Sequence, residues 1–333
     1  MSDWFKNKLR WMSLLATWAV VCIHANTTRW NGGELDFVNR VEGRLSVLFD
    51  FAVPLFFLIS GYLFAFSYKR YNYKDLLLRK FRSLYIPVIC WGVISLALSW
   101  PISIYAHTTP PNIINYLSLP LLMNFRVGSN HHFWYVRNLL VLFILAPLVY
   151  RIAGNATVLV FVIGLTTVLS LLFPALQIRF HLLVTVNYFC IGCLMGCRKN
   201  ECKVPRSGLV CGASSLLLVL ILLRPEFRET IVGSVLIPAV EVCWVWSLYD
   251  FIDGWYHLGK VKCASVLFFV YCMHNVALCW CGGLWRVAFG VEQTSRFLGW
   301  VFLCGSFWLF VIFALAIRRR FGRVFDVLSG GRG

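Results

Sequence analysis

The stretch Leu14–His24 reads Leu-Leu-Ala-Thr-Trp-Ala-Val-Val-Cys-Ile-His, an apolar run that ends on one ionisable side chain. A helix needs about 20 mostly apolar residues to cross a bilayer core, and the run reaches that length when it is extended to residues 9–26. Ionisable groups are costly in hydrocarbon and tend to mark function there. The run therefore predicts a membrane-spanning helix, and His24 is a candidate functional residue.

The composition points the same way. Of 333 residues, 59% are hydrophobic and 14% are charged, whereas a soluble domain carries about a quarter charged residues. The net charge of +17 could suggest nucleic-acid binding. The Lys and Arg residues cluster between hydrophobic runs, however, as they do in the cytoplasmic loops of membrane proteins. We therefore predict an integral membrane protein with no nucleic-acid partner.

Hydrophobic runs of spanning length recur along the whole chain. They predict an all-α, polytopic bundle of about ten transmembrane helices, over residues 9–26, 48–67, 84–106, 132–150, 155–173, 179–197, 207–223, 230–250, 263–281 and 297–317.

The distribution of basic residues predicts the orientation. When the segments between spans alternate from a cytoplasmic N-terminus, the inner ones collect most of the 31 Lys and Arg residues. This asymmetry favours two cytoplasmic termini and an even number of spans. The longest loops, 27–47 and 107–131, are too short for an independent core. We therefore expect one transmembrane domain over residues 1–333, with its chemistry inside the bundle.

His24 is predicted to lie about 22 Å along its helix from residue 9, toward the outer face. Burial favours the neutral imidazole, which suits a general base near neutral pH. A histidine that hydrogen-bonds a neighbouring helix for packing fits the sequence equally well.

Other costly groups accompany it. Arg137 follows His132 at the outer start of the fourth predicted span and needs a partner such as Asp50 or an acidic ligand. Glu241 in the eighth span is the acid that matches His274 in the ninth. Structural pairing could explain some of these groups, but together they indicate a polar site inside the bundle.

Two further motifs are suited to a ligand. Ser60 and Gly61 in the second span allow close helix approach or backbone access to a ligand, and packing is the favoured interpretation. Arg79, Lys80 and Arg82 precede the third span. If this segment is helical, the two arginines share a face and suit phosphate groups. A role in topology or in contacts with lipid headgroups is equally compatible with the spacing.

The cysteines do not indicate a metal. Cys190, Cys193 and Cys197 share a helical face, but no histidine or carboxylate lies beside them in the sequence. Most of the 13 cysteines lie within predicted spans, where a thiol behaves as a small hydrophobe. We therefore expect no metal site.

Taken in order, the motifs resemble the acyltransferase-3 family of bacterial membrane proteins. They are an early-span histidine, a Phe-Phe-x-x-Ser-Gly-Tyr-Leu stretch, an Arg-x-x-Arg followed by Pro, a Trp-Tyr helix ending in Ala-Pro-Leu, a Tyr-Phe-x-x-Gly and a late Tyr-x-x-His. Here they fall at His24 and at residues 56–63, 79–87, 134–148, 188–192 and 271–274.

The resemblance implies an O-acyltransferase of the bacterial inner membrane. Such proteins are thought to take an acyl group, usually acetyl, from cytoplasmic acyl-CoA. They pass it to a hydroxyl of an envelope polysaccharide or its lipid-linked precursor, with no metal. In this chain the resemblance makes His24 the base or transient acyl carrier. It makes the basic residues at 79, 80 and 82 the ligands of the CoA phosphates, and it makes Ser60 and Gly61 the lining of the acyl path.

One position departs from the family pattern. Many members place an arginine eleven residues before the histidine, where this chain has Ser13. Arg10 lies fourteen residues before His24, within about 40° of its direction on a helix. Its long side chain could therefore serve the same face, or the chain could belong to a divergent subgroup.

Two other classes of protein compete with an enzyme. Buried histidine, glutamate and arginine in ten spans would suit a proton-coupled transporter. Transporters often carry inverted repeats, and the Ser-Gly stretch of the second span has no counterpart in the later spans. A structural or sensory partner would not require histidines in two spans. Labelled acetyl-CoA separates these alternatives, because an enzyme transfers the label and a transporter moves solute without transferring it.

Overall fold

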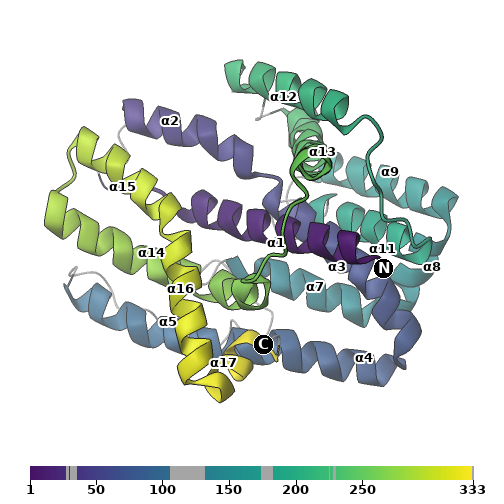
Figure 1. Cartoon of the computed structure of the whole chain (residues 1–333), viewed down its shortest axis with the longest axis horizontal. Helices are drawn as coiled ribbons and strands as arrows, with labels where there is room; N and C mark the ends of the chain where they lie inside the picture. The colour runs from purple at the N-terminus through teal and green to yellow at the C-terminus, as the bar shows by residue number, and fades with distance from the viewer. Residues whose placement is uncertain are drawn as a thin grey trace. The chain divides into compact units, whose positions relative to one another are not determined.

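The computed structural model describes residues 1–27, 30, 36–105, 132–173, 183–224, 226–227 and 230–331, and every regular element within these ranges is helical (Figure 1). The chain divides into two compact units. Unit 1 comprises residues 1–23, 40–76 and 145–264, and unit 2 comprises residues 24–39, 77–144 and 265–333.

The fold of membrane helices agrees with the sequence prediction. Among the described residues, five helical stretches are long and apolar enough to cross a membrane: Phe37–Arg70, Tyr73–Pro101, Val232–Tyr256, Ala264–Phe289 and Gln293–Arg320. A sixth is obtained if α7 (Trp134–Ile144) and α8 (Ala146–Gly154), which are separated by a break, form one span.

The count of ten spans and the cytoplasmic termini stay predictions. Each of the ten predicted runs is helical over most of its described length, and the ends of two runs, at residue 106 and residues 179–182, lie outside the described residues. Three of the remaining runs form shorter apolar helices, Ala156–Ser170, Val184–Cys197 and Ser207–Leu223. The first run lies in α1 (Asp3–His24), which carries Lys6, Lys8 and Arg10 in its first half.

Unit 1 is organised around the contact between α3 (Ala52–Arg70) and α11 (Phe189–Cys197). A Cβ atom at Gly61 would overlap the carbonyl oxygen of Phe189, and one at Gly192 would overlap the carbonyl oxygen of Leu58. A Cβ at Gly196 would lie 2.6 Å from the carbonyl oxygen of Tyr62. Small residues four apart let helix backbones approach this closely, so these glycines fix the crossing of the two helices.

Further helix contacts complete unit 1. The π-helix η5 (Leu183–Tyr188) contacts α3 and α9 (Ala156–Leu172), and α12 (Ser207–Leu223) packs along α13 (Ile231–Tyr256). Asn155 caps α9 by accepting hydrogen bonds from the backbone N–H groups of Thr157 and Val158, as expected of a short polar side chain at a helix start.

Unit 2 is built on α14 (Leu267–Phe289), which contacts α5 (Ile86–Tyr105), α15 (Gln293–Gly305), α16 (Phe307–Arg320) and α17 (Gly322–Ser329). The Phe269 ring lies 5.0 Å from the Trp91 ring and 5.2 Å from the Phe325 ring, measured between centroids. The Trp91 indole N–H donates to the carbonyl oxygen of Leu328. This aromatic cluster holds the C-terminal helix against α5 and α14.

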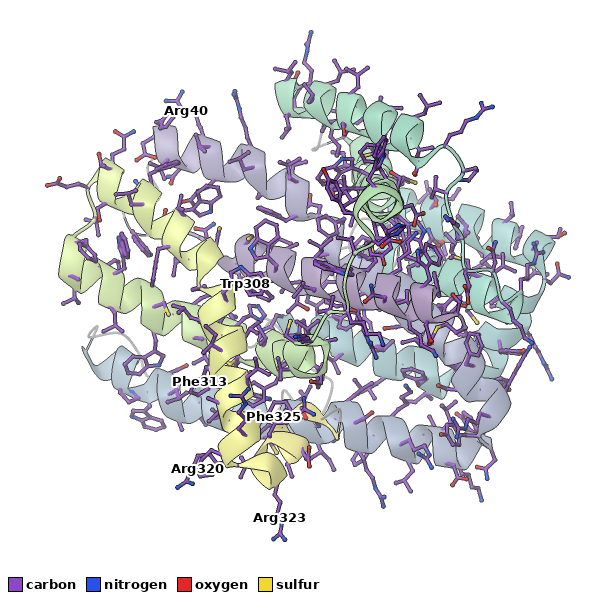
Figure 2. All side chains as sticks on the ribbon, in the orientation of Figure 1. Arg40, Trp308, Phe313, Arg320, Arg323 and Phe325 are labelled. Carbon is purple, nitrogen blue, oxygen red and sulfur yellow. The ribbon has the colours of Figure 1, made fainter. Side chains whose placement is uncertain are left out.

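The C-terminal helices carry their charges outward. Figure 2 shows Arg320 and Arg323 pointing away from α16 and α17, and both side chains are exposed, whereas Phe325 is buried. Gly330 ends α17 with φ +69°, and a Cβ there would overlap the carbonyl oxygen of Ser83. The C-terminal end of α17 therefore packs directly on the π-helix η3 (Phe81–Tyr85), which follows α4 (Tyr73–Lys80).

Candidate functional site

Three histidines singled out in the sequence come together in unit 2. His24 is the last residue of α1, His132 precedes α7 by two residues, and His274 lies within α14. The His274 ring centroid lies 5.0 Å from that of His24 and 4.6 Å from that of His132, and the His24 and His132 centroids are 6.3 Å apart. His132 and His274 are buried, while His24 is partly exposed. We call these three residues the imidazole cluster.

Tyr271 holds the cluster in place. Its phenol O–H donates to the backbone carbonyl of His132 at 2.7 Å, and its ring is edge-on to the His132 ring. Its own carbonyl lies 2.6 Å from Nδ1 of His274. One tyrosine thus ties the start of α7 to α14 and orients a second histidine. This gives a physical reason for a tyrosine three residues before the late histidine.

The contact with the Tyr271 carbonyl also sets the tautomer of His274. A carbonyl oxygen only accepts hydrogen bonds, so Nδ1 must be the donor. In the neutral imidazole Nε2 then carries the lone pair.

A cavity lies beside the partly exposed member of the cluster. It has a volume of about 110 Å³ and opens to the surroundings, and His24 and the buried amide of Asn275 contribute to its lining. Ligand pockets typically enclose about 300–1,000 Å³, so this cavity is smaller than a typical ligand pocket, and a larger ligand would extend through its open side. Among the members of the imidazole cluster, His24 lines this cavity, whereas His132 and His274 are not among its lining residues.

The basic segment lies in the same unit. Arg79 and Arg82 are exposed, and Lys80 is half-buried with Nζ 4.5 Å from the centroid of the Phe143 ring. The sequence prediction assumed α-helical spacing for the two arginines. That spacing ends at Lys80, because residues 81–85 form a π-helix. Single π turns are rare and frequently mark functional sites.

Helix α7 connects the basic segment to the imidazole cluster. His132 lies at one end of this helix, and Phe143, which contacts Lys80, lies near the other. At the rise of these helices the two residues are roughly 17 Å apart along the axis. The end of α7 beside Lys80 and the end beside the imidazole cluster are therefore separated by about the length of the helix.

Five predicted site residues lie in unit 1. Glu241 is fully buried, Asp50 is partly exposed and Arg10 is exposed. Gly61 contacts the backbone of α11, which accounts for that glycine by packing, and Ser60 precedes it on α3. Their roles at the site stay predictions.

Arg137, in unit 2, is half-buried, and its Nε donates to the side-chain oxygen of Asn138 at 3.0 Å. The pairings of Arg137 with Asp50 and of His274 with Glu241 stay predictions as well. Within the described residues no group of three or more His, Cys, Asp or Glu side chains is placed to hold a metal ion.

The comparison with protein families agrees with the motifs. The acyltransferase-3 family model, described as an acyltransferase domain, matches residues 7–319. The chain belongs to this family. The match runs through both units and includes the imidazole cluster and the basic segment, so this multi-helix membrane protein is an acyltransferase. No curated protein and no solved structure gives a significant match.

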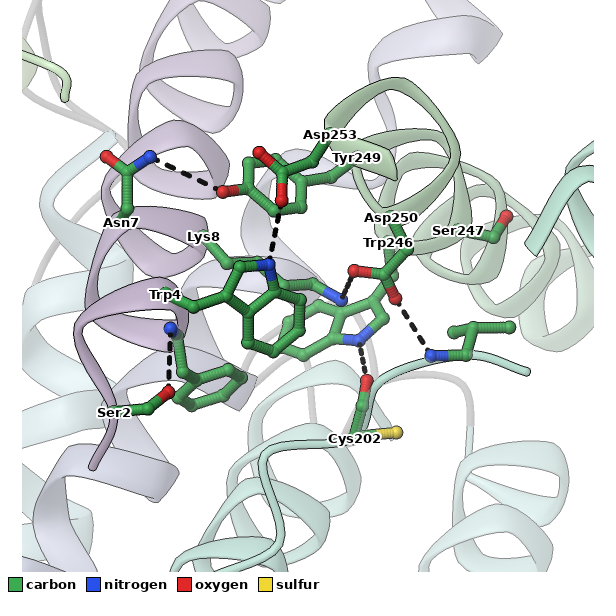
Figure 3. Close-up of polar contacts among 12 residues, drawn as sticks. Ser2, Trp4, Asn7, Lys8, Cys202, Trp246, Ser247, Tyr249, Asp250 and Asp253 are labelled. Atoms are coloured by element: carbon green, nitrogen blue, oxygen red, sulfur yellow. Dashed lines mark hydrogen bonds and ion pairs between the residues drawn. The ribbon is translucent and has the colours of Figure 1, made fainter. Parts of the chain in front are cut away.

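The structure also shows a buried ion pair in this acyltransferase that the sequence did not reveal. Nζ of Lys8 lies 2.7 Å from Oδ1 of Asp250, and both side chains are fully buried (Figure 3). The second carboxylate oxygen accepts the backbone N–H of Val204 at 2.9 Å. The Trp246 ring lies 4.3 Å from the ammonium, close enough for a cation–π contact. This pair joins α1 to α13 and to the 198–206 loop within unit 1.

Hydrogen bonds surround the ion pair. The Trp4 indole N–H donates to Asp253, and the Trp246 indole N–H donates to the carbonyl oxygen of Cys202 (Figure 3). Burial lowers the pKa of the Lys8 ammonium to about 8, although the Asp250 carboxylate opposes this shift. In the sequence Lys8 is one of several basic residues before the first span. The available signal was the pair of aspartates, 250 and 253, at the end of an apolar helix, which needed a partner.

A second buried charge was missed in unit 2. Arg296 at the start of α15 is almost fully buried, and its guanidinium donates to the side chains of Asp36 and Asn39. The backbone N–H of Asn39, and then Arg296, hold the pKa of Asp36 below its usual value. These bonds fix the start of α2 (Phe37–Ser46) on α15.

Proposed function

We propose that this acyltransferase moves an acyl group, acetyl being the expected one, from cytoplasmic acyl-CoA to a hydroxyl of a cell-envelope polysaccharide or its lipid-linked precursor. It would do so as a ten-span protein of the bacterial inner membrane with both termini in the cytoplasm. The observation that carries the proposal is the imidazole cluster, which borders a cavity and is joined by α7 to a basic segment.

His24 acts as the general base in this proposal, because it is the member of the cluster that lines the cavity. It takes the proton of the acceptor hydroxyl as that oxygen forms a bond to the carbonyl carbon of the thioester. The carbon–sulfur bond then breaks, and the CoA thiolate leaves and receives the proton from the imidazolium. Atoms and charges balance without a metal or an external oxidant. Positioned acid–base catalysis of this kind is worth about 10²–10⁴-fold in rate.

His274 and His132 support the base from behind. Their rings pack against each other, and Tyr271 holds both. The hydrogen bond from Nδ1 leaves the lone pair of His274 on Nε2, which suits a group that stabilises a developing imidazolium. They act as positioning residues, and the proton taken from the acceptor hydroxyl is held at His24 until the thiolate receives it.

The donor is bound by the basic segment. Arg79 and Arg82 present exposed guanidinium groups, which bind phosphate oxygens through two parallel hydrogen bonds, and Lys80 adds a third charge. The CoA phosphates bind there, and the acyl-pantetheine chain follows α7 toward the cluster. An extended chain of that kind can bridge the roughly 17 Å between the two ends of the helix.

An experiment with labelled donor tests the proposal. Membrane vesicles with and without the protein are incubated with acetyl-labelled acetyl-CoA, and the glycan fraction is examined by NMR for new O-acetyl groups. Label on a glycan that depends on the protein supports the proposal. Transport of a solute without transfer of label would overturn it in favour of a transporter.

A further inference from the structure

The cavity beside His24 has walls of a particular chemistry. All of them belong to unit 2, and they come from the last residue of α1 and the chain just after it, from α14 and from α15. The polar and aromatic side chains among them are His24, Asn26, Trp30, Asn275, Cys279 and Arg286.

The Trp30 indole is seated by two glycines. A Cβ atom at Gly282 on α14 would lie 3.1 Å from one ring carbon of Trp30, and a Cβ at Gly299 on α15 would lie 2.9 Å from another. Any larger residue at Gly299 would displace the indole or the neighbouring Trp285. The ring is half-buried and lines the cavity. A glycine on α14 and a glycine on α15 therefore leave the space that the Trp30 indole occupies at the wall of this cavity.

Arg286 brings a positive charge to the same wall. Its guanidinium carbon lies 5.9 Å from the Trp30 ring centroid, and the side chain is exposed. Arg286 forms no ion pair with any described residue. A cation in the last turn of a helix is favoured by the helix dipole, but the dipole does not require a cavity or an aromatic neighbour. Here the guanidinium faces the space that leads to His24.

We propose that this cavity binds the acceptor, and that the acceptor unit is a sugar ring carrying an anionic group, either a carboxylate or a phosphate. This inference rests on the proposed function. The indole offers a flat apolar surface to one face of the ring, and the amides of Asn26 and Asn275 offer hydrogen bonds to its hydroxyls. The planar fork of Arg286 matches the two oxygens of a carboxylate or phosphate. His24 then meets a hydroxyl of a ring that is held on two sides.

The binding test uses the exposed thiol of Cys279, which lines the cavity. The purified full-length protein is treated with a thiol reagent in the presence of glucuronate, glucose 1-phosphate or glucose, and modification of each cysteine is measured by peptide mass spectrometry. Cys243 in unit 1 is also exposed and serves as the internal control. We expect an anionic sugar to slow modification of Cys279 and not of Cys243. Protection by glucuronate alone identifies a carboxylate, and protection by glucose 1-phosphate alone identifies a phosphate.

The charge is tested with Arg286→Gln and Arg286→Lys. A hydrogen bond to a charged group is worth enough to change affinity by about tenfold or more. Arg286→Gln should therefore raise the half-protecting concentration of the anionic sugar by at least about tenfold, with Arg286→Lys between this variant and the wild type. The inference is overturned if all three sugars protect Cys279 equally or if none of them protects it. It is also overturned if the anionic sugar protects Cys279 as well in Arg286→Gln as in the wild type.

Transfer of labelled acetyl to the same sugars separates this inference from the proposed function. Protection of Cys279 without any transfer leaves the anion-binding cavity standing and contradicts the proposed function. Transfer of acetyl to a neutral sugar, with no protection of Cys279 by either anionic sugar, supports the proposed function and contradicts the anion-binding cavity. Protection and transfer with the same anionic sugar support both.

Discussion

Removing either partner of the Lys8–Asp250 pair should destabilise the protein far more than its place near the N-terminus suggests. The two charged atoms lie 2.7 Å apart, and neither side chain is exposed. Lys8→Met leaves the Asp250 carboxylate buried with only the Val204 N–H as a partner. Breaking a buried pair from one side costs about 3–5 kcal/mol. At roughly 2 °C per kcal/mol for a chain of this size, Tm should fall by about 6–10 °C.

The double variant Lys8→Met with Asp250→Asn is the informative comparison. It leaves no unpaired charge, and the amide oxygen still accepts the Val204 N–H. Removing both charges should therefore cost less than the sum of the two single changes, with a coupling of about 2 kcal/mol or more. The exposed pair Lys6–Asp3 has the same 2.7 Å separation and is the matched control. Lys6→Met should change the stability by less than about 1 kcal/mol.

The assay follows a dye that reacts with thiols while the protein is heated in detergent. Cys190, Cys193 and Cys211 in unit 1 are buried, so their labelling reports unfolding of the unit that contains the ion pair. Two results would contradict this expectation. One is a loss of stability in the double variant equal to the sum of the losses in Lys8→Met and Asp250→Asn. The other is a loss in either single variant no larger than that in Lys6→Met.

The pH gives a second signature of the buried ammonium. Because burial lowers the pKa of Lys8 from 10.5 to about 8, the unfolded chain binds this proton more tightly than the folded protein. The contribution of Lys8 to the free energy of unfolding should therefore rise between about pH 8 and 10.5. The difference in Tm between wild type and Lys8→Met should widen over that interval.

Three other changes test the donor site, the helix crossing and the histidine support. Arg79→Ala and Arg82→Ala should each raise KM for acyl-CoA by about tenfold and leave KM for the acceptor unchanged. Replacing the exposed Arg323 by Ala should change neither KM value. Equal effects of Arg79→Ala or Arg82→Ala on both KM values would contradict a donor site. Gly61→Ala should lower the free energy of unfolding by about 1–3 kcal/mol or more, because the added Cβ overlaps α11, and this loss is measured as a lower Tm. Gly43→Ala places its Cβ where no atom lies within 4 Å, so its Tm should equal that of the wild type. Similar Tm values for the two variants would argue against the close crossing of α3 and α11. Tyr271→Phe removes the hydrogen bond to the His132 carbonyl and should lower kcat about three- to tenfold with both KM values unchanged. Replacing the exposed Tyr256 by Phe should leave kcat unchanged. An unchanged kcat for Tyr271→Phe would show that Tyr271 does not position the histidines.

The helices were predictable because a local run of apolar residues is enough to indicate a membrane helix. The apolar runs at 207–223 and 263–281 were expected as helices, and the structure has helices there. The π-helix at 81–85 was not predictable, because the apolar pattern of that short segment does not distinguish α from π spacing. The number of spans depends on length and breaks as well as on composition. Five predicted spans are not among the five helical stretches of spanning length. They are the first span, in α1 with its charged first half, the span broken after Ile144, and the three that form the shorter helices Ala156–Ser170, Val184–Cys197 and Ser207–Leu223.

The candidate site was predictable as separate residues and not as an arrangement. His24 and His274 each stood out because ionisable groups are costly in apolar helices, and His132 lies at the outer start of the fourth predicted span. Their meeting depends on contacts between segments that are 108 to 250 residues apart in the chain, which local patterns do not encode. Lys8 shows the opposite error. A lysine beside other basic residues reads as a solvated topology signal, and only the packing of α13 reveals that it is buried.

The most direct test of the central claim compares acetyl transfer by the wild type, His24→Gln and His257→Gln. His257 is exposed and follows α13 in unit 1, so it controls for loss of a histidine in general. The account predicts that His24→Gln lowers kcat/KM by about 10²–10⁴-fold, with binding of acyl-CoA retained, and that His257→Gln behaves as the wild type. Transfer by His24→Gln at the rate of the wild type would contradict the account.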